Sequence, residues 1–314
     1  MVLKLVYIII LLIWCIYPLE SAWHRNLNED QYQTIARSGC NPKCGNVSIF
    51  FPFGMDNPKC YASKAFEIEC RHNNNTSQGG KPVPYLKNIN MEVMYIDIDE
   101  GAVAIKNPIF HLRNNCESTN TGKNLEGSPF VYSQNYNSFV AVGCQNAALL
   151  QSNDTILTAC VSVCYDQLNN GNDINIDSCR GKYCCSTSLP PNLSAYNISV
   201  EIVEVKSTIE PECAYVMIRA DYDLFAYVYD EYNYSYWAPT LGDLKSVHDV
   251  PVVLEWEIPI HTPNNSFPEF RRDLSGSYNC SYTNVTSSQY SHSGWRCSCS
   301  YGFQGNPYIQ EGCK

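Results

Sequence analysis

The sequence is poor in charged residues, in long hydrophobic runs and in catalytic motifs. Asp, Glu, Lys and Arg make up only 17% of its 314 residues, and long amphipathic helical windows are scarce. Its six histidines form no H-E-x-x-H pattern, and neither a G-x-S-x-G elbow nor a phosphate-binding glycine loop occurs. After the first 22 residues no stretch reaches 18 consecutive apolar residues, which argues against a second membrane span. We therefore expect a non-catalytic chain with little helix.

The N-terminus has the pattern of a secretory signal peptide. Lys4 is followed by the apolar run 5–16, then by Pro18 and the small residues Ser21 and Ala22. The run is shorter than the roughly 20 residues that a bilayer crossing needs, so a signal anchor is the weaker alternative. We expect residues 1–22 to be removed, and the mature chain to be secreted into the extracellular space.

Cysteine usage agrees with secretion. One of the 17 cysteines lies in the signal segment, so the mature chain keeps an even number that can form disulfides in an oxidising compartment. Zinc at the Cys-x3-Cys spacings is the less favoured reading there. The sequence leaves open the pairing of Cys40, Cys44, Cys60, Cys70, Cys116, Cys144, Cys160, Cys164, Cys179, Cys184, Cys185 and Cys213. The adjacent Cys184 and Cys185 are expected to bridge to different partners.

Glycosylation sequons are spread along the chain. Each accepts a glycan only on a surface, which suggests a glycoprotein exposed on many sides. The acceptor positions are Asn46, Asn74, Asn75, Asn153, Asn192, Asn197, Asn233, Asn264, Asn279 and Asn284.

Short alternating or β-branched segments dominate the remainder. Segments such as 91–99, 198–205, 214–220 and 250–258 read as strands bounded by turn residues. We predict an all-β, disulfide-rich fold with a small N-terminal cysteine-rich module, a larger β module and a small C-terminal module.

The segment "CGNVSIFFPFG" (44–54) places a sequon next to large apolar residues. In a strand, Asn46 and Ser48 point to one face while Val47 and Ile49 point to the other. Pro52 cannot donate a ladder hydrogen bond and ends or edges such a strand. We interpret the segment as a scaffold for a small core, with direct sugar contact as the minority reading.

The charge is distributed unevenly. Residues 23–90 contain eight Lys and Arg against five Asp and Glu, a net charge of +3, whereas residues 91–314 contain 12 against 25, a net charge of −13. A basic N-terminal module beside an acidic remainder suggests an anionic partner, although scatter in a short segment would explain the same numbers. No nucleic-acid partner is expected.

Several ordered motifs resemble plant wall-associated receptor kinases. "GCNPKCGNVSIFFPFG" followed by "KCYASKAFEIEC" resembles their galacturonan-binding cysteine-rich module, and "YCCSTSLPPNL" and "VPVVLEWEIP" resemble the extracellular region that follows it. "WRCSCSYGFQGNPYIQEGC" is similar to their EGF-like repeat. The expected division is a galacturonan-binding domain at 35–105, an associated extracellular domain at 106–259, a linker at 260–279 and a partial EGF-like module at 280–314.

The resemblance implies the ectodomain of a receptor that contacts pectin in the cell wall. A membrane span and an intracellular Ser/Thr kinase follow in such proteins, and this sequence reaches Lys314 without either. An incomplete gene, a soluble family member and an isolated ectodomain all remain open. A membrane location is expected only through a C-terminal span of a longer protein.

The EGF-like part departs from the family pattern. Two of the six cysteines are missing, and the resemblance implies that the surviving pairs are Cys280–Cys297 and Cys299–Cys313. The acidic ligands expected before the first cysteine of a calcium-binding EGF module are absent. We expect no metal bound in this module.

The expected ligand is pectic galacturonan, a polyanion with one carboxylate per sugar. Basic side chains can pair with these carboxylates, and tyrosines can cover the apolar face of a ring. Candidate contacts are Lys43, Lys59, Tyr61, Lys64, Arg71, Lys81, Tyr85 and Lys87. Calcium bridging between acidic residues such as those at 97–100 and the sugar carboxylates is a second, less favoured route.

Other readings are weaker. The aromatic stretch 222–237 could form a sugar-stacking platform, but a core strand face is more common. Asp221 and Asp223 could mimic the carboxylate pair of a glycosidase, without any supporting constellation. The alternative to pectin binding is a soluble apoplastic protein that binds a protein or peptide, as a decoy or co-receptor.

Overall fold

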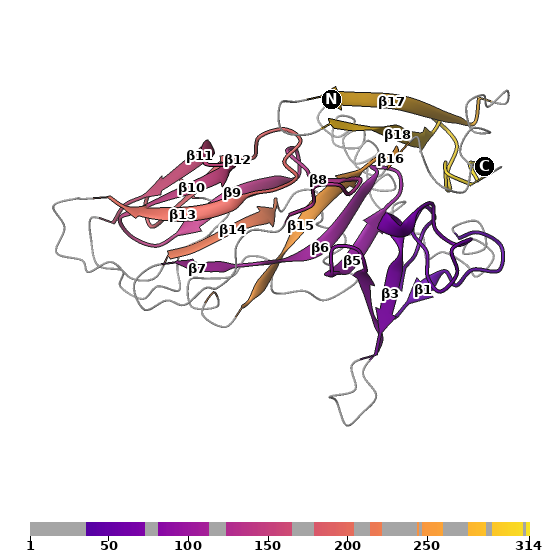
Figure 1. Cartoon of the computed structure of the whole chain (residues 1–314), viewed down its shortest axis with the longest axis horizontal. Helices are drawn as coiled ribbons and strands as arrows, with labels where there is room; N and C mark the ends of the chain where they lie inside the picture. Colours follow the sequence, from indigo (N-terminus) through magenta and orange to yellow (C-terminus); the bar gives the residue numbers. More distant parts are fainter. Residues whose placement is uncertain are drawn as a thin grey trace, which may run out of the picture.

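The computed structural model describes residues 36–72, 81–112, 124–164, 179–203, 214–221, 244, 247–259, 276–286, 291–309 and 312–314. Within these ranges the chain is built from antiparallel strands in five sheets, with short turns of 3-10 helix such as η2 (Lys64–Phe66) (Figure 1). The prediction of an all-β, disulfide-rich fold is confirmed.

The largest sheet has six strands in the order β3-β4-β5-β6-β15-β8. Their bounds are β3 (Ile68–Arg71), β4 (Val83–Leu86), β5 (Met91–Asp97), β6 (Ala102–Pro108), β15 (Asp249–Trp256) and β8 (Phe130–Tyr132). Beside it lies the small hairpin of β1 (Lys43–Cys44) and β2 (Val47–Ser48). Figure 1 shows β6 and β15 side by side in the middle of the molecule.

This sheet joins two of the expected domains. β6 pairs with β15 along its whole length, from Ala102 opposite Glu255 to Pro108 opposite Asp249. The boundary expected at residue 105 therefore falls inside a strand whose backbone hydrogen bonds link it to residues 249–255. Sequence patterns could not reveal this, because the partners are more than 140 residues apart.

Two further sheets form the other half of the molecule. One has the order β12-β9-β14-β7, with β12 (Cys184–Ser188), β9 (Asn137–Val142), β14 (Ala214–Ala220) and β7 (Phe110–Leu112). The other has the order β11-β10-β13, with β11 (Thr155–Ser162), β10 (Asn146–Ser152) and β13 (Asn197–Ile202). Phe139 and Val216 of the first sheet share one apolar core with Leu150 of the second, so the two sheets bury their facing sides.

The C-terminal part is a hairpin of β17 (Tyr278–Thr286) and β18 (Ser291–Cys299), extended by β16 (Ile258–Pro259). It is attached to the rest by more than its chain connection. The amide of Asn306 donates a hydrogen bond to the carbonyl of Phe51 at 2.7 Å, and Arg296 pairs with Glu255 at 3.0 Å. Of the expected linker 260–279, only residues 276–279 are described, and 278–279 already belong to β17.

The segment 44–54 is a scaffold in the structure. Val47, Ile49, Phe51 and Phe53 are buried, while Asn46 is exposed on the turn between β1 and β2. Phe53 contacts the rings of Phe66, Phe130 and Trp256 at centroid distances of 5.2, 6.1 and 4.9 Å. The core of the N-terminal module is therefore continuous with that of the following region.

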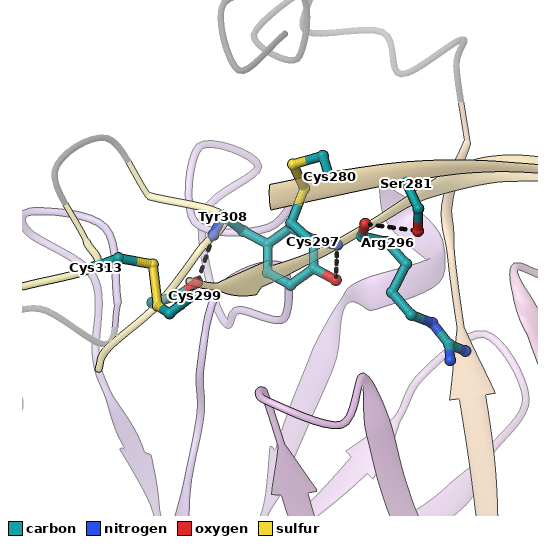
Figure 2. The surroundings of a disulfide bond; sticks show 8 residues. Cys280, Ser281, Arg296, Cys297, Cys299, Tyr308 and Cys313 are labelled. Carbon is teal, nitrogen blue, oxygen red and sulfur yellow. Dashed lines mark hydrogen bonds between the residues drawn. A yellow bond between two sulfur atoms is a disulfide. The ribbon is translucent and has the colours of Figure 1, made fainter. Parts of the chain in front are cut away.

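Seven disulfides lie within the described residues: Cys40–Cys60, Cys44–Cys70, Cys144–Cys164, Cys160–Cys185, Cys179–Cys184, Cys280–Cys297 and Cys299–Cys313. The last two are the pairs that the resemblance implies (Figure 2). Between them, the hydroxyl of buried Tyr308 accepts a hydrogen bond from the backbone N–H of Cys297 at 3.1 Å. The adjacent Cys184 and Cys185 bridge to different partners, as expected, and Cys116 and Cys213 lie outside the described residues.

Candidate functional site

The loop at residues 55–66, here called the lysine loop, is held firmly against the core. The Cys40–Cys60 disulfide ties its middle to the segment before β1, and the N–H of Ala62 donates to the carbonyl of Pro52 at 2.9 Å. Buried Phe66 anchors its end. The loop is thus a fixed platform for the exposed side chains of Lys59 and Lys64.

These two lysines are the cations available to an anionic ligand. Neither makes an ion pair with any residue that the structure describes. A third cation, Arg37, lies beside Lys59, because its guanidinium donates to the carbonyl of Lys59 at 3.2 Å and stacks 4.2 Å above the ring of Phe51. The sequence placed Arg37 among the basic residues of the module without marking it as a contact. Its place beside Lys59 depends on the fold.

Two other cations, Arg71 and Lys87, lie on the outer face of the β3–β4 pair and already have carboxylate partners. Arg71 donates through Nε and Nη2 to one oxygen of Glu69, at 2.8 and 2.6 Å. Lys87 pairs with Glu67 at 2.6 Å, and this hydrogen bond is the main cause that raises the pKa of Lys87. We call Glu67, Glu69, Arg71, Tyr85 and Lys87 the charged ladder.

Tyr85 shares this face but is covered by its neighbour. It lies opposite Glu69 across the strand pair, and the guanidinium of Arg71 sits 4.1 Å from its ring centre. A sugar ring can stack on that face of Tyr85 only if Arg71 moves. A ligand that contacts the charged ladder therefore replaces an existing partner of Arg71, Tyr85 or Lys87 and adds no new contact to a free group.

Lys43 and Lys81 form a third group around the β1–β2 turn. Lys81 donates to the side-chain oxygen of Asn46 at 3.0 Å, and Lys43 lies opposite Ser48 in the hairpin. Asn46 is the first residue of a sequon, so a glycan there would extend from beside Lys81. This group would then be partly screened from a polymer.

Tyr61 does not lie on the surface. Its side chain is 6% exposed and belongs to the main core, and burial is the largest cause that raises the pKa of its phenol. The residue could not stack on a sugar without unfolding the loop.

The acidic turn at residues 97–100 is held by hydrogen bonds between its own residues. One oxygen of Asp97 accepts the backbone N–H groups of Asp99 and Glu100 at 3.1 and 3.0 Å. Burial is the main cause that raises the pKa of Asp97. The nearby phenol of Tyr136 donates a hydrogen bond to Glu100, and its own burial together with this hydrogen bond raises the pKa of Tyr136 to about 12. Within the described ranges, no group of three or more His, Cys, Asp or Glu residues is arranged to hold a metal ion.

The remaining sequence candidates are only partly described. Asp221 accepts a hydrogen bond from the hydroxyl of Ser138 at 2.9 Å, while Asp223 and the aromatic stretch 222–237 lie outside the described residues. Among the sequons, Asn46, Asn153, Asn197 and Asn279 have exposed side chains. The described residues include no helix with the length and hydrophobicity that a membrane crossing requires.

Comparison with known proteins agrees with the motifs. Residues 40–107 match the family model described as "Wall-associated receptor kinase galacturonan-binding". The resemblance is confirmed. The matched residues include the lysine loop, the charged ladder and all of β6 except its last residue.

Relatives extend this similarity along the chain. The Arabidopsis thaliana proteins "Wall-associated receptor kinase-like 5" and "Wall-associated receptor kinase-like 3" are each 29% identical over 88% of this chain and 38% of their own lengths. "Wall-associated receptor kinase-like 10" is 29% identical over 90% of this chain and 39% of its own. The chain thus spans about two fifths of these curated relatives. No solved structure matches it.

Proposed function

We propose that the chain binds pectic galacturonan, without catalysis, as extracellular part of a wall-associated receptor kinase-like protein at the plant cell wall. The match of residues 40–107 to the galacturonan-binding family model is the observation that supports this most directly. The lysine loop lies inside the matched residues and presents two unpaired cations on a disulfide-anchored platform.

The lysine loop is the main contact in this proposal. Galacturonan offers one carboxylate per sugar, Lys59 and Lys64 are exposed on the same loop, and Arg37 lies beside Lys59. Each exposed ion pair contributes up to about 1 kcal/mol, so useful affinity needs several pairs along the polymer. Such contacts weaken as salt screens them.

The charged ladder is a secondary contact. A sugar carboxylate that binds Arg71 or Lys87 must displace Glu69 or Glu67, so the net gain is smaller than that at an unpaired lysine. Substitution of Lys59 and Lys64 should therefore reduce affinity more than substitution of Arg71 and Lys87. The sequence alone gave no reason to rank these cations.

The test is a titration of the secreted, fully oxidised protein with de-esterified oligogalacturonide at low and high salt, with and without calcium. We expect saturable binding that salt weakens. Lys59→Gln/Lys64→Gln should lower the affinity about 5- to 30-fold, which corresponds to the loss of two contacts of about 0.5–1 kcal/mol each.

A matched control removes the same charge elsewhere. Arg180 and Lys182 are exposed on the loop that the Cys179–Cys184 disulfide closes, outside the matched residues. Arg180→Gln/Lys182→Gln should leave the affinity within about twofold, since loss of a distant exposed charge contributes little. An equal loss in both variants would mean a general effect of net charge.

Two results would change or overturn the proposal. Binding that requires calcium and survives the lysine substitutions would place the contact at acidic groups. No binding by a folded, oxidised protein under any condition would overturn the pectin assignment and favour a protein or peptide ligand.

A further inference from the structure

The outer face of the sheet β11-β10-β13 carries exposed apolar side chains along β11. Its inner face is buried through Ala148, Leu150 and Cys160, whereas Ile156 and Val161 point away from that core and are 56% and 47% exposed. These two belong to the small set of large hydrophobic side chains that the described part of the chain leaves exposed. Ile156, Ala159 and Val161 form an exposed apolar strip along β11, and such a strip calls for a cover.

The register of the sheet sets the composition of this face. Three rows cross it from β11 to β13: Ile156, Gln151 and Asn197; Ala159, Leu149 and Ser199; Val161, Ala147 and Glu201. The β11 side of every row is apolar and the β13 side is polar. The cover must therefore be amphipathic and must lie across the strands.

An acceptor for such a cover is part of the face. Asn197 begins the sequon Asn197-Ile198-Ser199 and has an exposed side chain. It lies in the same row as Ile156 with one strand between them, a separation of about 10 Å at the usual strand spacing. The first sugars of a glycan on Asn197 would project over this row.

A second acceptor lies at the same end of the sheet. Asn153 occupies the tight turn between β10 and β11, where Ser152 pairs with Thr155, and its φ of 47° is one that Asn tolerates. Its sequon is Asn153-Asp154-Thr155. Glycans on Asn153 and Asn197 would thus both leave the molecule at the end of the sheet that carries Ile156.

We propose that N-glycans of this chain, seated on Asn197 and supplemented from Asn153, cover the outer face of the sheet β11-β10-β13. The acetamido methyl and C–H faces of N-acetylglucosamine lie over Ile156 and its neighbours, and the sugar hydroxyls face water. A glycan on β13 also shields the edge strand of this sheet from pairing with another chain. A docking protein is the poorer occupant, because an acceptor residue stands within the face itself.

The test compares glycan loss at this face with loss elsewhere. Mass spectrometry of the secreted protein should find Asn197 occupied. Asn197→Gln and Ser199→Ala each remove that sequon and should raise the fluorescence of a hydrophobic dye and concentration-dependent association severalfold. Asn279→Gln, which removes an exposed sequon on β17, is the matched control and should change neither.

A suppressor variant identifies the apolar residues responsible. Ile156→Thr/Val161→Thr in the Asn197→Gln background should return dye binding and association to near the wild-type level. If the Asn197 variants fail to fold, enzymatic deglycosylation of the folded wild-type protein and of the Thr double variant gives the same comparison. Oligogalacturonide affinity should be unchanged throughout, so this result is separate from that for the lysine loop.

Three outcomes would overturn the proposal: an unoccupied Asn197, an equal increase in dye binding on loss of the Asn279 glycan, or no suppression by the threonine substitutions.

Discussion

Phe53 should determine whether the chain unfolds as one unit. The residue is 1% exposed and packs against Phe66 of its own module and against Phe130 and Trp256 of the next region. Phe→Ala in a core costs about 3–5 kcal/mol, a large share of a typical stability of about 5–15 kcal/mol. We therefore expect Phe53→Ala to be poorly secreted.

Phe53→Leu is the usable variant. It keeps most of the buried apolar volume and removes the ring contacts, each of which is worth about 0.5–1.5 kcal/mol. With three contacts of unequal geometry, we expect a loss of about 1–3 kcal/mol in the free energy of unfolding. Phe303→Leu, at a 40% exposed ring, should change stability by less than about 0.5 kcal/mol.

The assay is chemical unfolding of the oxidised protein, monitored by tryptophan fluorescence, together with hydrogen exchange of the native protein. The shared sheet and aromatic cluster predict that Phe53→Leu lowers the protection of β6 and β15 together. Separate transitions, with β15 unaffected while the N-terminal strands open, would refute the argument that the two regions share one core.

Two other predictions concern local strain and pH. Gly39 and Gly45 both have positive φ, so alanine should cost about 1–2 kcal/mol of stability at either position. A Cβ at Gly45 would also lie 2.1 Å from the carbonyl oxygen of Pro82, so the urea midpoint of unfolding should fall clearly further for Gly45→Ala than for Gly39→Ala. Equal losses would contradict the close approach. Burial raises the pKa of Asp97 above its ordinary value of 3.8, so the folded state holds this proton more strongly than the unfolded state does. The stability of the fold should therefore fall as the pH rises from about 3.8 through the raised pKa. Melting temperatures of Asp97→Asn should show a weaker decline between acidic and neutral pH than those of the wild type, and an unchanged decline would exclude Asp97 as its source.

The local features of the fold could be predicted from sequence. Alternating segments became strands because their period of two places every second side chain on the core face. The segment 44–54 could be read in the same way, with Asn46 outside and Val47 inside. The role of this segment as a scaffold and the family resemblance could both be predicted from residues that are neighbours in the sequence.

The ranking within the candidate site could not be predicted. Sequence composition treats Lys59 and Lys87 as equal cations, but strand pairing and turn geometry decide which lysine meets a carboxylate. Lys87 meets Glu67, a residue 20 positions earlier, whereas Lys59 projects from a loop. Tyr61 is a similar case, since only the folded loop shows that its ring belongs to the core.

The sequence by itself determined the all-β class, the exposed positions of Asn46, Asn153, Asn197 and Asn279 and the family resemblance, because each depends on local pattern. Only the tertiary structure decided that residues 102–108 pair with 249–255, that Phe53 packs against Trp256, and that Asn306 holds the carbonyl of Phe51. These contacts join residues more than 140 positions apart. Their partners are chosen by how the whole chain buries its apolar surface and satisfies its backbone hydrogen bonds, which no local window records.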